Sequence, residues 1–165
     1  MPTNLLKTYP QLLEIDHLNE AQRTTSLKGI FKRDIEDNTD FNFKTKKINP
    51  IKSEEDAMQL LFKHLTTKIV DKKTNRREFE PQRSKRLHWI KYHIEENKPD
   101  NMLIFSVEDP EGIRTYIFDE EQNYVIILEP YRNQQEYYLL TAYYLDGRNP
   151  QKIRRKYKRR LPQII

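Results

Sequence analysis

The first hundred residues show apolar positions at three- and four-residue spacing, which is the period of a helix with one buried side. This pattern predicts two short helices, over residues 4–14 and 17–30, around Pro10. It also predicts a longer helix over residues 54–66. Residues 41–48 lack the helical period, and we expect a loop with a short strand there.

A further helical stretch follows Pro81 and ends before Pro99, over residues 82–97. Its segment RLHWIKYHIEEN contains two sets of residues at helical spacing. The first set is apolar and predicts a buried stripe: Leu87, Ile90 and Ile94. The neighbouring set is polar: His88, Lys91, Tyr92 and Glu95. One helix would thus present an imidazole, an ammonium, a phenol and a carboxylate side by side, as a solvated surface or as a site for chemistry.

After Pro99 the period changes from helical to alternating, with many β-branched and aromatic residues. Four strands are predicted, over residues 102–108, 112–118, 123–128 and 136–145. Connectors of hairpin length join them, which indicates an antiparallel meander. Asn149 and Pro150 then begin a last helix with a narrow apolar side. The predicted fold is therefore α+β: N-terminal helices, a four-stranded antiparallel sheet and a basic C-terminal helix.

Composition narrows the class of protein. A chain of 165 residues with ten Tyr, seven Phe and one Trp is large enough for one main core. The chain has no Cys, which excludes a disulfide framework and a thiolate metal site. No stretch approaches the roughly 20 apolar residues of a membrane span, and the first residues do not resemble a signal peptide. We therefore expect a cytoplasmic protein without membrane contact.

The positive charge of the chain is concentrated at its end. The formal net charge is +5, but residues 146–165 contain eight Lys and Arg residues and one acid. The remainder of the chain is slightly acidic. A polyanion is the partner that this distribution favours, and a solvated basic tail is the alternative.

Several kinds of active site lack their motifs. There is no Gly-rich phosphate loop, no HExxH and no GxSxG, and the four His show no ligand pattern with carboxylates. We therefore predict neither a metal nor a cofactor. His64, His17 and His93 are interpreted as structural or surface residues. His88 differs because Lys91 and Tyr92 lie one helical turn away.

The last predicted strand is rich in tyrosine. Strict alternation places Tyr137, Thr141 and Tyr143 on one side and Tyr138 and Tyr144 on the other. Such a wall can stack bases and offer hydroxyl groups to phosphate. Core packing is the alternative, since aromatic residues are good strand formers.

The succession RREFEPQRSKRLHWIKYHIEEN, NYVIILEPY and YYLLTAYYLDGRNPQKIRRKYKRR resembles phage-encoded and toxin-type ribonucleases of the barnase, EndoU, colicin and RelE group. The resemblance covers about half the chain, roughly residues 76–160. It implies a ribonuclease domain over residues 76–165, after a helical N-terminal region over residues 1–75 whose role is unassigned. It also implies an active site without metal. The residues at the motif positions are His88 and Lys91 on the helix, and Thr141 and Tyr143 or Tyr144 on the strand.

The leading hypothesis is a metal-independent endoribonuclease that uses the ribose 2′-OH as nucleophile and leaves a 2′,3′-cyclic phosphate. His88 would transfer protons, because its ordinary pKa of about 6.5 lies near working pH. Lys91 and Arg114 would hold the phosphate, Thr141 would bond a phosphate oxygen or the 2′-OH, and Tyr143 or Tyr144 would stack a base or assist proton transfer. The C-terminal helix would add phosphate contacts from Arg154, Arg155 and Arg159.

Two other functions stay open. One is a non-catalytic module that binds RNA or the ribosome. The other is a phage regulatory or structural protein with a nucleic-acid-binding tail. A nuclease of this kind also needs restraint in the cell, so an inhibitor or antitoxin protein is an expected partner.

Overall fold

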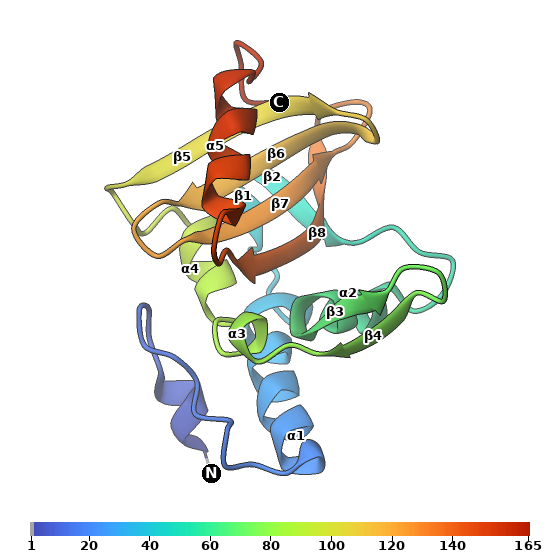
Figure 1. Ribbon diagram of the computed structural model, residues 1–165, viewed down its shortest axis with the longest axis vertical. Coiled ribbons are helices and arrows are strands. Elements are labelled where there is room, and N and C mark those ends of the chain that lie inside the picture. The colour runs from blue at the N-terminus through green and yellow to red at the C-terminus, as the bar shows by residue number, and fades with distance from the viewer. Residues whose placement is uncertain (1) are drawn as a thin grey trace.

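The computed structural model describes residues 2–165, which form a curled mixed sheet between two layers of helices (Figure 1). Helices and helical turns occupy seven segments: η1 (Pro2–Leu6), α1 (Glu20–Phe31), η2 (Lys32–Glu36), α2 (Ala57–Thr66), α3 (Pro81–Ser84), α4 (Trp89–Ile94) and α5 (Asn149–Lys158). The strands are β1 (Asn42–Phe43), β2 (Lys46–Pro50), β3 (Thr67–Asp71), β4 (Arg76–Phe79), β5 (Met102–Asp109), β6 (Gly112–Asp119), β7 (Tyr124–Pro130) and β8 (Glu136–Tyr144).

The four alternating segments after Pro99 form the antiparallel meander β5–β6–β7–β8, as the sequence predicts. Their alternation places one set of side chains on each side of the sheet. Ile117 and Ile126 belong to the core on one side, and Phe118 and Val125 to the core on the other. The α+β class and the order of these elements are therefore confirmed.

The sheet has six strands, so the prediction of a four-stranded antiparallel sheet is wrong in number and direction. The order is β1-β2-β8-β7-β6-β5, and β2 pairs with β8 in parallel. The segment KKINP of β2 has no alternating pattern of its own and becomes a strand by pairing. Residues 1–75 and residues 76–165, predicted as two regions, therefore both contribute strands to this sheet.

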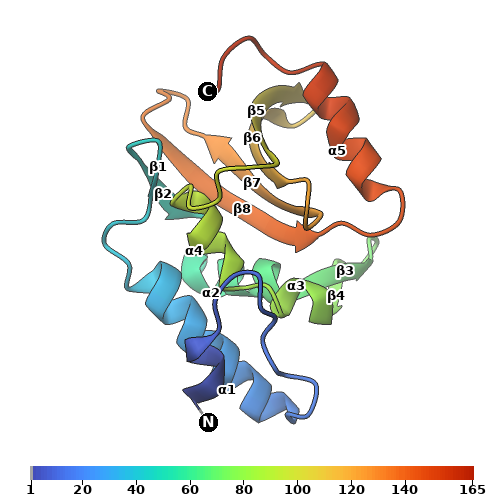
Figure 2. The ribbon, with the colours of Figure 1, turned by 90° about the vertical axis from the view of Figure 1, so that its left-hand side faces the viewer.

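Two hydrophobic clusters lie on opposite sides of the sheet (Figure 2). The larger one joins α1, α2 and α4 to the sheet, with Trp89 and Tyr124 among its largest fully buried side chains. The smaller one lies under α5, where Ile153 is buried and Tyr157 is partly buried against Phe105. Helix α5 therefore has the predicted apolar side, which packs on the sheet. Its charged side faces outward.

The predicted helix over residues 82–97 is divided into α3 and α4. Leu87, Ile90 and Ile94 are buried as expected, each 1% exposed, but Trp89 is also 1% exposed. Leu87 and Trp89 would point about 200° apart on a regular helix, so a continuous helix cannot bury both on one side. The chain resolves this with a tighter turn, in which the N–H groups of Leu87 and Trp89 bond carbonyls three residues back. His88 lies in that turn, so it does not share a helical stripe with Lys91.

A second, two-stranded sheet consists of β3 and β4. The segment TKIVD forms β3, and the polar segment RREF forms β4. Asn75 supplies the turn between them with a left-handed φ of 57°. Among residues 2–165, no helix is long and apolar enough to cross a membrane.

Candidate nucleic-acid interface

His88 lies at the start of α4, beneath the N-terminal segment. Its side chain is buried, and neither ring nitrogen has a hydrogen-bond partner. The ring is close to the Gln11 backbone, but the Gln11 carbonyl accepts a 3.0 Å bond from the Trp89 indole. Burial, together with the positive charges of Arg33 and Lys7, lowers the pKa of His88 to about 4. His88 is therefore a neutral, packed histidine at neutral pH.

His88 and Thr141, assigned to one site from the sequence, do not bond each other. The Thr141 hydroxyl instead donates to the carbonyl of His64 at 3.4 Å, at the end of α2. Lys91 is also separate from His88, because its ammonium forms an exposed ion pair of 2.8 Å with Glu95. Tyr92 stacks on Tyr9, with ring centroids 4.5 Å apart. The polar stripe expected on one helix is thus split between the interior and the surface.

His93, interpreted from the sequence as a packing or surface residue, belongs to a buried polar network. Its Nε2 lies 2.9 Å from Oδ2 of Asp119, and its Nδ1 lies 2.7 Å from the Trp89 carbonyl. Both ring nitrogens therefore face an oxygen acceptor. Burial acts to raise the pKa of Asp119, but hydrogen bonds from His93 and Tyr9 bring it below its ordinary value. This network links the N-terminal segment to α4 and β6. No local sequence motif predicts it.

The basic residues of α5 divide into two groups. Lys156 and Arg159 hold the helix to the sheet, because both donate to Asp109, at 2.6 and 3.1 Å. Burial acts to raise the pKa of Asp109, but hydrogen bonds from Lys156, Tyr116 and Arg159 lower it. Arg154 lies 3.3 Å from Glu120. Three exposed cations within α5 form no ion pair with any of residues 2–165: Lys152, Arg155 and Lys158, here called the basic face of α5.

Arg114 lies away from the tyrosines that were predicted to work with it. Its neighbour Thr115 pairs with Leu128, which pairs with Leu139 near the start of β8. Tyr144 lies at the other end of β8. The Arg114 side chain is mostly buried, and it donates to the carbonyl of Ile113.

A β-bulge changes the sides on which the β8 residues lie. The register shifts between Ile127 and Leu128, so that Leu140 is an extra residue. As a result Tyr137 packs in the core under α4, whereas Tyr143 packs against the cluster under α5. The single tyrosine wall that strict alternation predicts is therefore absent.

The end of β8 instead meets three arginines, here called the arginine cluster: Arg77 on β4, Arg83 on α3 and Arg86 in the turn after α3. The guanidinium of Arg83 lies 5.1 Å from the centre of the Tyr143 ring, and that of Arg86 lies 4.1 Å from the centre of the Tyr144 ring. Sequence analysis identified these two tyrosines as candidates. Arg77 lies on β4, a strand that the sequence pattern did not predict.

The α2 terminus connects two of these arginines. Arg83 Nη1 donates to the carbonyls of His64 and Thr67, at 2.8 and 2.7 Å. Arg77 donates to the hydroxyl and the carbonyl of Thr67, at 2.8 and 2.9 Å. A helix C-terminus with free carbonyls is a favourable place for cations, which explains why the sequence gathers arginines there.

The arginine cluster forms no ion pair within residues 2–165, although the nearby Glu80 acts to raise the pKa of Arg83 and Arg86. Among residues 2–165, no carboxylate lies within 4.0 Å of these guanidinium nitrogens. Glu80 uses its oxygens to accept from the backbone N–H groups of Gln82 and Arg83. Burial lowers the pKa of all three arginines, and Arg77 lowers that of Arg83 further. The Nε atoms of Arg83 and Arg86 are buried without a partner. Such a group of charges is costly unless an anion joins it.

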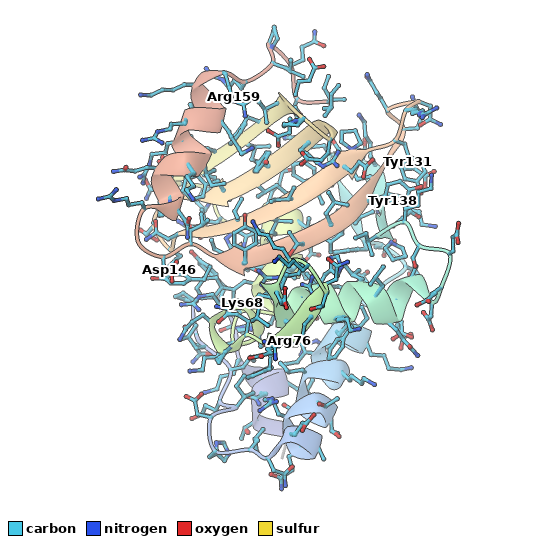
Figure 3. The ribbon with its side chains drawn as sticks, turned by 45° about the vertical axis from the view of Figure 1, so that its right-hand side comes forward. Lys68, Arg76, Tyr131, Tyr138, Asp146 and Arg159 are labelled. Carbon is cyan, nitrogen blue, oxygen red and sulfur yellow. The ribbon has the colours of Figure 1, made fainter. Side chains whose placement is uncertain are left out.

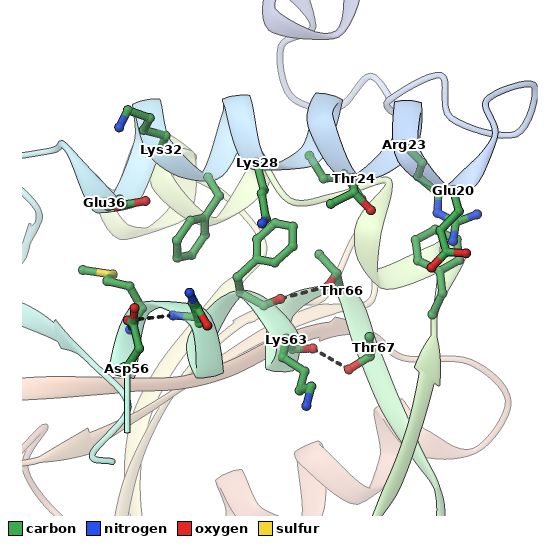
Figure 4. Close-up of a pocket in the computed structure, with 16 residues that line it drawn as sticks. Glu20, Arg23, Thr24, Lys28, Lys32, Glu36, Asp56, Lys63, Thr66 and Thr67 are labelled. Atoms are coloured by element: carbon green, nitrogen blue, oxygen red, sulfur yellow. Dashed lines mark hydrogen bonds between the residues drawn. The ribbon is translucent and has the colours of Figure 1, made fainter. Parts of the chain in front are cut away.

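A groove between α1 and α2 opens beside the arginine cluster (Figure 4). Its volume is about 740 Å³, and Phe31, Phe62 and Phe79 contribute to its lining. No group of three or more His, Asp or Glu side chains within residues 2–165 is placed to hold a metal ion.

A comparison with protein-family models finds no match for this chain, and neither does a comparison with curated proteins or with solved structures.

Proposed function

We propose that the protein binds RNA and that the arginine cluster holds a backbone phosphate. The observation that supports this most directly is the group of three half-buried guanidiniums without a carboxylate partner. A phosphate group would supply the missing negative charge. Tyr143 and Tyr144 border the arginines and offer ring surfaces to a base.

Two exposed groups of cations extend this site. One is the basic face of α5, and the other is on the β3–β4 hairpin, where Lys68, Lys72, Lys73 and Arg76 are exposed. Figure 3 shows Lys68 and Arg76 on the hairpin and Asp146 in the connection that leads to α5. Contacts from such side chains to phosphates give affinity without sequence preference.

The experiment measures the affinity of a fluorescent single-stranded RNA for the wild type and for Arg83→Gln, by anisotropy at several salt concentrations. Loss of one charge-assisted phosphate contact should weaken binding roughly 10- to 150-fold, from about 1.5–3 kcal/mol per such bond. Lys47→Gln, which removes an exposed charge on β2, serves as the matched control. Equal affinity of all three proteins, or no binding by the wild type, would contradict the proposal.

Metal-independent cleavage of RNA is a second candidate, and the position of His64 favours it. Burial lowers the pKa of His64, and Arg77 lowers it further, so the imidazole is neutral at neutral pH and suited to accept a proton. In that reaction His64 removes the proton of the ribose 2′-OH and the 2′ oxygen bonds phosphorus. The bond to the 5′ oxygen breaks, that oxygen takes a proton from solvent, and the His64 imidazolium returns its proton to solvent. Arg83 would stabilise the charge that develops on the phosphate oxygens.

Cleavage is tested with the same RNA in EDTA, with analysis of the products for a 2′,3′-cyclic phosphate. His64→Ala should reduce the rate by roughly 10²–10⁴-fold, whereas His88→Gln should leave it unchanged at neutral pH. Binding without cleavage would leave the RNA-binding proposal in place and remove the enzymatic one. We predict an inhibitor protein as a partner only if the protein cleaves RNA.

A further inference from the structure

The groove between α1 and α2 has an apolar floor and a largely cationic rim. The apolar residues that line it are Leu27, Phe31, Met58, Phe62 and Phe79. Around them lie four cations: Arg23, Lys28, Lys32 and Lys63. The volume of about 740 Å³ falls within the range of roughly 300–1,000 Å³ that small-ligand sites occupy.

Two of these cations lie over the aromatic rings. The Arg23 guanidinium is 3.6 Å from the centre of the Phe79 ring, and the Lys28 ammonium is 5.9 Å from the centre of the Phe62 ring. Neither cation forms an ion pair with another of residues 2–165. Rings next to free cations are the combination that single-stranded nucleic acids use, with bases on the rings and phosphates on the charges.

Three carboxylates also line the groove, at its two ends. Figure 4 shows Glu36 and Asp56 at one end and Glu20 at the other, with Lys28, Thr24 and Lys63 between them. Asp56 caps α2, and its Oδ1 accepts from the N–H groups of Met58 and Gln59, at 3.1 and 3.2 Å. The middle of the groove therefore contains aromatic rings and cations, without a carboxylate.

The groove is continuous with the arginine cluster. Thr67 lines the groove and also accepts hydrogen bonds from Arg77 and Arg83 through its carbonyl. Arg77 and Phe79 lie two residues apart on β4, so they share one side of that strand. A chain with a phosphate at the cluster can thus continue directly over Thr67 into the groove.

We propose that the α1–α2 groove binds the unpaired bases of single-stranded RNA that extends from the phosphate at the arginine cluster. This inference rests on the proposed function and makes it more specific: the substrate is single-stranded. Bases within a duplex are stacked and paired, so their faces cannot reach Phe62 between two helices. Bases of a single strand are free to do so.

The test compares three labelled probes: a 4-nucleotide oligouridylate, a 12-nucleotide oligouridylate and a 12-base-pair RNA duplex. The groove variant is Phe62→Leu combined with Lys28→Gln, which removes one ring and one charge but keeps the site apolar. Stacking of one base contributes ~1–3 kcal/mol, so affinity for the 12-nucleotide probe should fall at least fivefold. Affinity for the 4-nucleotide probe and for the duplex should change less than twofold.

Lys63→Gln is the second variant, because Lys63 is exposed at the groove rim and its replacement leaves the floor intact. It should weaken only the 12-nucleotide probe, about two- to fivefold. Arg83→Gln, in contrast, should weaken all three probes. If both groove variants bind the 12-nucleotide probe as the wild type does, the groove proposal is overturned and RNA binding at the cluster stands. If the wild type binds none of the probes, the proposed function itself fails.

Discussion

The hydroxyl of Tyr9 donates a 2.6 Å hydrogen bond to the carboxylate of Asp119, 110 residues further along the chain. The same Tyr9 ring packs edge-on against Trp89 and stacks on Tyr92. A single residue of the N-terminal segment thus contacts both α4 and the end of β6. This relationship makes the segment part of the core rather than a separate arm.

Tyr9→Phe should lower the free energy of unfolding by about 1.5–3 kcal/mol, the range for a hydrogen bond to a charged group. His93 and the Gln122 N–H still bond Asp119 in this variant, so the protein should fold. Tyr92→Phe is the matched control, since its hydroxyl makes an exposed 3.3 Å bond. Urea unfolding of the two variants measures the difference. Equal losses would show that the Asp119 network does not stabilise the fold.

Acidification should destabilise the protein through His88. The folded-state pKa of about 4 lies below the ordinary 6.5, so the folded state binds fewer protons than the unfolded state between these values. The stability that neutral His88 contributes to the folded state is fully present above pH 6.5 and is lost as the pH falls towards 4. Between pH 7 and 5 it amounts to about 2 kcal/mol.

His88→Gln should remove this pH dependence, which is measured by urea unfolding of wild type and variant at both pH values. Protonation places the ring charge near the positive charges of Lys7 and Arg33, which oppose it. His17→Gln, at an exposed position, is the control. A variant with the same pH dependence as the wild type would mean that His88 is hydrated in solution.

Arg83→Met should weaken RNA binding while changing the free energy of unfolding by less than about 1 kcal/mol. Removing one partner of a buried ion pair costs about 3–5 kcal/mol, but Arg83 has no such partner. The two carbonyls that it bonds keep other donors, Thr141 for His64 and Arg77 for Thr67. Thermal melting with and without inorganic phosphate tests this, because a ligand at a hundred times its Kd stabilises the folded state by ~2.7 kcal/mol. Phosphate should raise the Tm of the wild type more than that of the variant.

The basic face of α5 should act through salt-dependent contacts. Lys152→Gln, Arg155→Gln and Lys158→Gln together should reduce the slope of log affinity against log salt by about 2, at ~0.7 per phosphate on a single strand. Because these three side chains are exposed, the Tm of the triple variant should equal that of the wild type. Lys156→Gln should behave differently, with a lower Tm, because Lys156 bonds the buried Asp109. An unchanged salt slope in the triple variant would assign the basic face to another partner.

Features that depend on local pattern could be predicted from the sequence, and features that depend on distant contacts could not. Strands β5 to β8 and helix α5 follow from alternation and from the Asn149–Pro150 start. The parallel pairing of Lys47 with Glu136 has no local signal, because β2 is too short and polar to show one. The extra residue Leu140 reverses the alternation of β8 after Leu139, which a pattern count cannot detect.

The candidate site shows the same division. Tyr143 and Tyr144 could be selected from composition, because tyrosines gather in one strand. The other half of the site comes from α2, β4 and α3, whose residues His64, Arg77 and Arg83 meet only after folding. The spacing of His88 and Lys91 predicts that both lie on one side of a regular helix. The tight turn before α4 breaks that helix, so the spacing does not place them together.

The parallel pairing of β2 with β8 also determines when the native sheet is completed. Residues 46–50 leave the ribosome long before residues 136–139, yet each needs the other to form its backbone ladder. The meander can form first from neighbouring hairpins, but closing a loop of this length carries an entropic cost that local contacts do not repay. The edge of β8 that accepts β2 therefore stays open until the N-terminal half docks. During synthesis that edge is open to pairing with another molecule.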